Sequence, residues 1–173
     1  MEIKFKRKHD GVHIPKYATE GSAGFDLRVD SFKTYYQDGN ATPRDFATDP
    51  NIPRDGEEVQ TMYMFPGSRL LIGCGFKIAI PCGYAMDIRP RSGLALLKGI
   101  AVLNSPGTID SDYRGEIGVI LVNHSRDIVY ITKGDKVAQG VIIKVETAEF
   151  KLADHLPETA RAEGGYGSTD IVN

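Results

Sequence analysis

The sequence is short of several features that would mark particular classes of protein. It has no tryptophan, only two cysteines, and no apolar run near the length of about 18 residues that a membrane-spanning helix needs. Cys74 and Cys82 are not spaced as a CxxC pair, and no further cysteine completes a zinc site. We therefore expect no membrane partner, and two small buried thiols in a reducing compartment.

The charge balance is also unremarkable, since the net charge is −2 at pH 7. A nucleic-acid-binding domain is more often strongly basic, so nucleic acid is not expected as a partner. Residues 1–11 alternate charged and apolar side chains, which is unlike a signal peptide. These features predict a cytoplasmic protein, with the nucleus or the cytoplasm of a virus-infected cell as other compartments that fit.

What the sequence does have is glycine, at 19 of 173 residues, together with many short apolar or alternating runs. Each run is bounded by Gly, Pro, Asn or Asp, which is typical of strands of about four to eight residues separated by turns. One all-β domain of the sandwich, barrel or jelly-roll type is expected. The predicted strands are EIKFK (2–6), SRLLIGCGFKIAI (68–80), YAMDIRP (84–90), GIAVLN (99–104), GEIGVILVN (115–123), DIVYIT (127–132) and KVAQGVIIKV (136–145).

Three segments depart from the strand pattern. RSGLALLKG (91–99) suits a helix of about two turns that ends at its last glycine. Residues 34–60 are rich in Pro, Asp, Asn and Gly and predict a long loop, either a solvated insertion or a lid or partner-binding surface. Near the C-terminus the apolar periodicity fades, with one candidate strand at 149–152 and an arm at 153–173.

The stretch PRSGLA (90–95) combines the groups of an anion site. Arg91 offers a planar fork of donors, Ser92 a hydroxyl, and Gly93 a backbone N–H that a ligand can approach closely. At the start of a short helix these groups suit a phosphate. Taken alone, the same residues also describe an ordinary helix start.

The stretch NSPGTIDSDYRGEIGVILVN (104–123) predicts a hairpin whose turn, DSDYRG, forms a polar tip. Asn104 carries an amide that both donates and accepts, as the edge of a nucleobase requires. Asp110 carries a carboxylate that suits a general base acting on water beside a phosphate. An aspartate that simply forms the turn is the alternative.

Two further stretches add polar groups. In KGDKVAQG (133–140) a turn precedes a strand on which Gln139 points to the face opposite Ala138, either into a site or into solvent. In RAEGGYGSTD (161–170) glycines let backbone N–H groups converge on an anion. The tail's other groups that suit a nucleotide are Arg161, Ser168 and Thr169 for phosphate and Tyr166 for stacking on a flat ring. A flexible tail is the alternative.

Five stretches resemble, in order, the five motifs of the trimeric dUTPase family: AGFDL (23–27), PRSGLA (90–95), NSPGTIDSDYRGEI (104–117), KGDKVAQ (133–139) and RAEGGYGSTD (161–170). The resemblance implies a distorted jelly-roll β-barrel subunit over residues 1–152, followed by the C-terminal arm, and assembly as a homotrimer. Each active site is then shared between subunits, and the arm arrives from a further subunit. The implied reaction is hydrolysis of dUTP to dUMP and pyrophosphate with Mg²⁺, which limits uracil incorporation into DNA and supplies dUMP for thymidylate synthesis.

The same resemblance implies roles by position. Asp110 would activate water for attack on the α-phosphorus, and Asp26 would support the site indirectly. Mg²⁺ would be held by the triphosphate and water, without a direct protein ligand. On the phosphate chain, the substrate contacts would be Arg91, Ser92, Gly93 and Gln139. On the nucleoside they would be Asn104, Tyr113 and the main chain near Gly118, with Gly107 and Thr108 as further contacts. In the arm, Tyr166 would stack over uracil, and the terminal phosphates would be bound by Arg161, Gly167, Ser168 and Thr169.

Two positions and one segment depart from the family pattern. Ala162 stands where a second glycine is common, and Asp170 stands where a small residue is usual. The 34–60 segment lengthens the spacing between the first two motifs. It leaves open a binding or regulatory protein that uses this segment as the contact surface for a protein partner. A related dCTP deaminase would need a glutamate at the position of Ile120, which argues against deamination.

Overall fold

The structure, a computed structural model, describes residues 1–36, 44–45 and 61–164. This part of the chain forms thirteen strands and one helix, which confirms the predicted all-β class with a single short helix. The elements are β1 (Lys4–Arg7), β2 (Phe25–Arg28), β3 (Ser31–Tyr36), β4 (Arg44–Asp45), β5 (Thr61–Met64), β6 (Arg69–Gly73), β7 (Phe76–Ala79), β8 (Tyr84–Pro90), α1 (Ser92–Lys98), β9 (Ile100–Val102), β10 (Gly107–Ile109), β11 (Gly118–Asn123), β12 (Val129–Thr132) and β13 (Lys136–Lys144).

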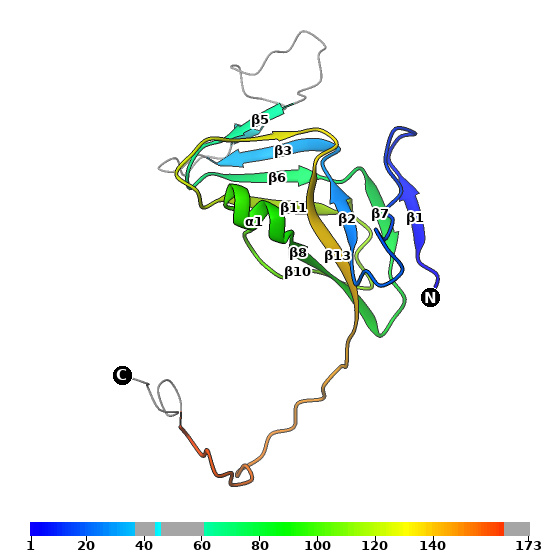
Figure 1. The fold of residues 1–173 in the computed structure, drawn as a ribbon. Coiled ribbons are helices and arrows are strands. Elements are labelled where there is room, and N and C mark those ends of the chain that lie inside the picture. The colour runs from blue at the N-terminus through cyan, green and yellow to red at the C-terminus, as the bar shows by residue number, and fades with distance from the viewer. Residues whose placement is uncertain (37–43, 46–60, 165–173) are drawn as a thin grey trace.

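The strands form two larger sheets that share one core (Figure 1). One sheet has the order β10-β8-β13-β2 and the other the order β4-β3-β6-β11-β9, while β1-β7 and β12-β5 are two-stranded. The core holds Leu27 and Met86 from the first sheet and Leu70, Ile72 and Leu121 from the second, all without exposed surface. Burial of these side chains holds the two sheets together in a jelly-roll-like fold. The described sheets remain separate and do not close into one continuous barrel.

The helix and its C-terminal end match the sequence prediction. Helix α1 begins after Arg91 and ends at Gly99, whose φ of 64° and ψ of 19° form a left-handed cap. The cap N–H bonds to carbonyl groups of the last helical turn. Leu96 and Leu97 are 84% and 81% exposed, and the helix adds no buried residue to the core of the chain.

The strand prediction is wrong in detail at two places. The run 68–80 is two strands, β6 and β7, because Gly75 turns the chain between them with a φ of 75°. A side chain at Gly75 would also collide with Asp30, so glycine is required there. Residues 34–36 end β3, and residues 44–45 pair with it as β4, so both belong to a sheet instead of a loop. The rest of that predicted loop lies outside the described residues.

The predicted hairpin at 104–123 is also wrong. Its two arms pair with different strands, β10 with β8, and β11 with β6 and β9. The arms therefore diverge into the two larger sheets, and the turn DSDYRG connects the sheets. Strand pairing depends on the neighbours that bury each face, and here those neighbours override the local turn signal.

Strand β13 is the last strand in the described part of the chain (Figure 1). Residues 145–164 carry neither helix nor strand, so the candidate strand at 149–152 is wrong. Phe150, Leu152 and Leu156 are 96%, 102% and 84% exposed, so these side chains bury little apolar surface against the described residues of the chain. The division between domain and arm at residue 152 stays a prediction.

The two cysteines have different surroundings. Cys74 is buried as predicted, and its burial raises the pKa of its thiol, with the charges of Glu116 and Asp30 adding to the effect. Cys82 is exposed, contrary to the prediction, because it lies in the turn between β7 and β8. Among the described residues, no helix has the length and apolarity to cross a membrane.

Candidate active site

A pocket of about 400 Å³ opens where β10 and β11 diverge. This inter-sheet pocket has walls from both larger sheets and from the loop 110–116. It is lined by Lys33, Leu71, Ile72, Gly73, Ile88, Val102, Asn104, Gly107, Thr108, Ile109, Tyr113, Glu116, Ile117, Gly118, Val119 and Ile120. The predicted substrate contacts Asn104, Gly107, Thr108, Tyr113 and Gly118 therefore gather in one place.

Two glycines give the inter-sheet pocket its shape. A Cβ atom at Gly107 would lie 3.1 Å from Asn104 Nδ2 and 3.4 Å from Ile88 Cβ, so Gly107 leaves room for the Asn104 side chain. A Cβ atom at Gly118 would lie 3.2 Å from Leu71 Cδ1. At both positions the missing side chain lets a ligand approach main-chain groups closely.

The loop 110–116 forms part of the pocket wall. Asp110 follows β10 directly, and its side chain is exposed. Its carbonyl oxygen accepts the Tyr113 N–H at 3.2 Å, and the Tyr113 hydroxyl donates to the Glu116 carbonyl oxygen at 3.1 Å. A side chain at Gly115 would collide with the Tyr113 ring, so glycine is required there. The aspartate and tyrosine of the third motif thus lie in one compact turn.

Glu116, a carboxylate that the motif comparison gave no role, binds this loop to the body of the subunit. Its Oε1 accepts the Gly75 N–H at 3.0 Å, and its Oε2 lies 3.1 Å from Lys33 Nζ and 3.6 Å from Lys8 Nζ. Burial alone would raise the pKa of Glu116, but the hydrogen bonds from Lys33 and Gly75 and the charges of Lys33 and Lys8 hold it below its usual value. Burial alone would lower the pKa of Lys33, but Glu116 holds it above its usual value.

A second site lies beside α1 and is basic, whereas most residues that line the inter-sheet pocket are apolar or glycine. This basic hollow has a volume of about 330 Å³, with four cationic side chains and one carboxylate on its walls. It is lined by Arg28, Arg91, Leu94, Lys98, Tyr130, Ile131, Gly134, Asp135, Lys136 and Val137. An excess of positive charge in a concave surface favours a polyanionic ligand.

Asp26 organises two of these cations. Its Oδ1 lies 3.3 Å from Arg91 Nε, and its Oδ2 lies 2.6 Å from Lys136 Nζ. Arg91 Nη1 also donates to the Lys136 carbonyl oxygen at 3.0 Å. Strand pairing fixes this arrangement, because β2 and β13 are neighbours with Asp26 opposite Gln139. Asp26 thus contacts Arg91 directly, and Lys136 is a member of the cluster that the sequence did not single out.

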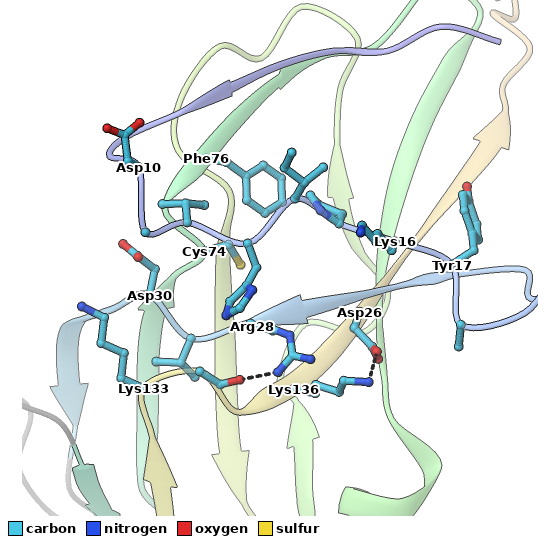
Figure 2. A pocket seen from close by; sticks show the side chains of 18 residues that line it. Asp10, Lys16, Tyr17, Asp26, Arg28, Asp30, Cys74, Phe76, Lys133 and Lys136 are labelled. Atoms are coloured by element: carbon cyan, nitrogen blue, oxygen red, sulfur yellow. Dashed lines mark hydrogen bonds and ion pairs between the residues drawn. The ribbon is translucent and has the colours of Figure 1, made fainter.

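A larger cavity of about 730 Å³ adjoins the basic hollow (Figure 2). It lies between residues 10–18 and β2, and the ion pair of Asp26 and Lys136 stands on its wall. Arg28 Nη1 donates to the Gly134 carbonyl oxygen at 2.8 Å, which is one of the dashed lines in Figure 2. The cavity and the hollow share Arg28, Gly134 and Lys136, so the basic surface continues from one into the other.

The remaining groups of the second and fourth motifs lie at the helix start. Ser92 and Gly93 open α1 and are exposed, and no described atom comes within 4 Å of a Cβ atom placed at Gly93. The first N–H groups of a helix have no acceptor within the helix, so they are available to a ligand. Gln139 Nε2 donates to the Pro90 carbonyl oxygen at 3.0 Å, which joins the fourth motif to the second. Ala138 is fully buried, so Gln139 lies on the opposite face as predicted.

The inter-sheet pocket and the basic hollow have no lining residue in common among the described residues. The larger cavity shares none with the inter-sheet pocket either. The residues predicted to contact the nucleoside therefore line a different pocket from Arg91, which is predicted to contact the phosphates.

Only the beginning of the arm motif is described. Arg161 Nε donates to the Gly164 carbonyl oxygen at 2.9 Å, and the Ala162 N–H donates to the Thr159 carbonyl oxygen at 3.0 Å. Ala162 has a φ of 44°, in the left-handed region where a Cβ atom is unfavourable. The other arm positions singled out in the sequence, Tyr166, Gly167, Ser168, Thr169 and Asp170, lie outside the described residues.

Sequence comparison finds relatives along nearly the whole chain. The family model for dUTPase matches residues 58–170. A protein of Dinoroseobacter shibae named deoxyuridine 5′-triphosphate nucleotidohydrolase is 43% identical over 160 residues, which cover 92% of this chain and 89% of that protein. A protein of the same name from Nautilia profundicola is 41% identical over 169 residues, which cover 98% and 99% of the two chains.

Solved structures share the fold. The dUTPase of Staphylococcus bacteriophage 80alpha, solved with dUPNHPP, matches with a TM-score of 0.71 at 18% identity, over 98% of this chain and 99% of that one. The dUTPase of S. aureus phage phi11, described for its species-specific insert, matches with a TM-score of 0.67 at 18% identity, over 92% and 100%. At this identity the match concerns the fold alone. The family model and the two bacterial relatives show that the chain belongs to the dUTPase family.

Proposed function

We propose that this protein is a dUTP diphosphatase, which hydrolyses dUTP to dUMP and pyrophosphate in the cytoplasm. Such an enzyme limits uracil incorporation into DNA and supplies dUMP for thymidylate synthesis. Family membership supports the reaction class. The observation that carries the proposal is the pairing of one shaped, largely apolar pocket with one separate, strongly basic hollow. A nucleoside triphosphate has a matching pair of ends, since its nucleoside suits a shaped, largely apolar pocket and its triphosphate suits a basic hollow.

The separation of the two sites supports a homotrimer with shared active sites. A bound nucleotide needs its base pocket and its phosphate site side by side, and within one chain the two are lined by different residues. Assembly would place the inter-sheet pocket of one subunit against the basic hollow of another, with the arm of a further subunit closing over both. The exposed side chains of Phe150, Leu152 and Leu156 give that arm apolar surface to bury on a neighbour.

The inter-sheet pocket would take the deoxyuridine end. The Asn104 amide and the main chain at Gly118 can match the donors and acceptors on the edge of uracil. Tyr113 would pack on the deoxyribose and leave no room for a 2′-hydroxyl. Gly107 and Thr108 complete this wall. A pocket with fixed walls excludes the methyl group of thymine by shape.

The same pocket disfavours the related deaminase activity. Ile120 lies on its wall and is partly buried. A dCTP deaminase would need a glutamate at this position to transfer protons. An aliphatic side chain has no proton to give or accept, so the pocket supports phosphate hydrolysis over deamination.

The basic hollow would take the triphosphate. Arg91, Ser92 and Gly93 bind the phosphate chain, with Gln139 near the α-phosphate. Arg161, Gly167, Ser168 and Thr169 of the arm then contact the terminal phosphates, while Tyr166 stacks over uracil. Asp26 supports the site by holding Arg91 and Lys136 in place. These cations stabilise the negative charge that grows on the leaving pyrophosphate.

Asp110 would act as the general base. Its carboxylate accepts a proton from water as the water oxygen bonds to the α-phosphorus, and the bond from that phosphorus to the bridging oxygen breaks to release pyrophosphate. Mg²⁺ bound to the triphosphate would offset the charge of the leaving group. The described residues include no cluster of three His, Cys, Asp or Glu side chains. In this proposal Mg²⁺ is held by the triphosphate and water and needs no direct protein ligand.

Pyrophosphate release from dUTP, dCTP and dTTP tests the proposal. The unmodified protein should strongly prefer dUTP, and Asp110→Asn should lower kcat about 10²–10⁴-fold while dUTP still binds. Asp127→Asn is the matched control, because it removes an exposed carboxylate outside both sites. Absence of dUTP hydrolysis by the unmodified protein would overturn the function, and near-normal turnover by Asp110→Asn would overturn the role of that residue.

A further inference from the structure

The loop 110–116 is connected to the rest of the subunit by few polar contacts. Most of its hydrogen bonds stay inside it, such as those from Arg114 Nη1 to the carbonyl oxygens of Ser111 and Tyr113, at 2.6 and 2.8 Å. Among the described residues of this loop, Glu116 is the one whose side chain forms ion pairs or hydrogen bonds with the rest of the fold. The position of the whole turn therefore depends on that carboxylate.

Glu116 uses both carboxylate oxygens and reaches three separate parts of the fold. Oε1 accepts a backbone N–H from the turn between β6 and β7 at 3.0 Å. Oε2 lies 3.1 Å from Lys33 on β3 and 3.6 Å from Lys8, the residue after β1. The Glu116 side chain is 20% exposed and that of Lys33 is 35% exposed, so solvent only partly screens their interaction.

The surroundings of this carboxylate are tightly filled. A Cβ atom at Gly73 would collide with the side chains of both Glu116 and Lys33. Gly73, Lys33 and Glu116 also line the inter-sheet pocket, together with Tyr113 from the same loop. A shift of Glu116 therefore changes the pocket wall itself, because Glu116 lines the pocket and packs closely against Gly73.

We infer that Glu116 is a positioning residue, which sets the width of the inter-sheet pocket by holding the loop 110–116 against β3 and the β6–β7 turn. This inference rests on the proposed function, in which the pocket takes the uracil base. The residue acts through Tyr113 and the loop, so its loss loosens the pocket without removing the general base. The expected consequence is weaker binding of dUTP and weaker rejection of a pyrimidine that carries a 5-methyl group.

The variants Glu116→Gln and Lys33→Met test the inference from the two sides of the ion pair. Glu116→Gln keeps an acceptor for Gly75 and loses the charge, and Lys33→Met keeps an aliphatic chain of similar length. Glu116→Gln should raise KM for dUTP about 5- to 30-fold with a smaller change in kcat, and should lower the ratio of kcat/KM for dUTP to that for dTTP about tenfold. Lys33→Met should shift both quantities in the same direction, and the double variant should shift them no further than Glu116→Gln.

The matched control is Glu146→Gln, which removes the carboxylate of an exposed ion pair with Lys144, with side chains 88% and 72% exposed. It should leave KM and the dUTP-to-dTTP ratio unchanged. Amide hydrogen exchange gives a second readout that does not need activity, since Glu116→Gln should speed exchange in residues 110–117 and leave β8 and β13 protected. If both ion-pair variants keep the normal KM, the normal ratio and slow exchange, the inference is wrong. If the unmodified protein does not hydrolyse dUTP, the proposed function fails, and the exchange result alone decides whether Glu116 holds the loop.

Discussion

The inter-sheet pocket is walled mostly by strands whose positions are fixed by backbone pairing, whereas the basic hollow is walled by long cationic side chains, two of which pair with one carboxylate. In the pocket, β6 and β11 pair at five positions, and Ile117 and Val119 have at most 1% of their surface exposed. In the hollow, the side chains of Arg91 and Lys136 are 36% and 38% exposed. Close packing resists displacement, while solvated side chains adjust to a ligand.

This difference separates two tasks that a nucleotide enzyme has to perform. Fixed walls discriminate between bases that differ by one methyl group, because a buried surface cannot yield without loss of packing. Partly exposed cations bind the charge that every nucleoside triphosphate carries, and they do not distinguish one base from another. Variants in the pocket should therefore change which nucleotide is used, and variants in the hollow should change the rate for all of them.

Among the variants that compare the pocket with the hollow, the largest effect is expected from Arg91→Ala in the basic hollow. The change removes the forked donor proposed to bind the phosphates, while Asp26 keeps its ion pair with Lys136 at 2.6 Å, so the fold should persist. We expect kcat/KM for dUTP to fall about 10²–10³-fold, with the preference for dUTP over dTTP unchanged. Arg126→Ala, at an exposed cation outside the hollow, should leave kcat/KM for dUTP and the preference for dUTP over dTTP unchanged. A loss of preference in Arg91→Ala would show that the hollow also reads the base.

A smaller effect, on the choice of nucleotide, is expected from Gly107→Ala in the inter-sheet pocket. The new Cβ atom would lie 3.1 Å from Asn104 Nδ2 and would push the amide out of place. KM for dUTP should rise about tenfold, and the dUTP-to-dTTP ratio of kcat/KM should change. Gly21→Ala is the matched control, since no described atom lies within 4 Å of its Cβ position. Equal losses for both nucleotides would contradict a shape-based site.

In the arm, Ala162→Gly should produce a modest gain. Ala162 holds a φ of 44°, a conformation that is unfavourable by roughly 1–2 kcal/mol for a residue with a Cβ atom. Glycine removes this cost but is more flexible in the open arm, so we expect kcat/KM to rise no more than about threefold. Ala160→Gly, two residues earlier and with no positive φ, should give no gain. A decrease in Ala162→Gly would show that the left-handed turn is absent from the closed arm.

The smallest effect concerns stability as a function of pH. The folded-state pKa of Glu116 is lowered, so its ion pair stabilises the fold fully above the unfolded value of 4.5 and loses this effect as the pH falls through the folded value. The pKa of Lys33 is raised, so the same pair weakens only as the pH rises beyond the unfolded value of 10.5. The difference in unfolding free energy between the unmodified protein and Glu116→Gln, measured by urea titration, should be constant between these limits and shrink in acid. A difference that grows in acid would contradict the assignment.

Local sequence patterns were sufficient for the elements that depend on neighbouring residues. The helix at 92–98 follows from its leucines and from Gly99, and β8 and β13 follow from long apolar runs between turn residues. The motif comparison also selected Asn104 and Gly107, which meet in the inter-sheet pocket. These features could be predicted because the information lies within one short stretch of chain.

Features that depend on distant partners were missed. The stretch 104–123 reads as a hairpin, but its two arms find better partners in separate sheets. Lys136 and Glu116 lie inside recognised motifs, yet their roles depend on Asp26 and Lys33, which reach them only through the folded sheets. Short strands such as β5 (Thr61–Met64) were missed as well, because four residues give too little periodicity to identify.

Because the pocket and the hollow have no lining residue in common within one chain, mixtures of two inactive variants should regain activity if the active site is shared between subunits. Asp110 adjoins the inter-sheet pocket and Arg91 lines the basic hollow, so a shared site would draw them from different subunits. Two inactive variants, Asp110→Asn and Arg91→Ala, should then complement each other when their subunits are mixed. With random assembly of equal amounts, about one-quarter of the sites would combine an intact Asp110 with an intact Arg91. A cell that carries both alleles would keep part of the activity that neither allele supplies alone.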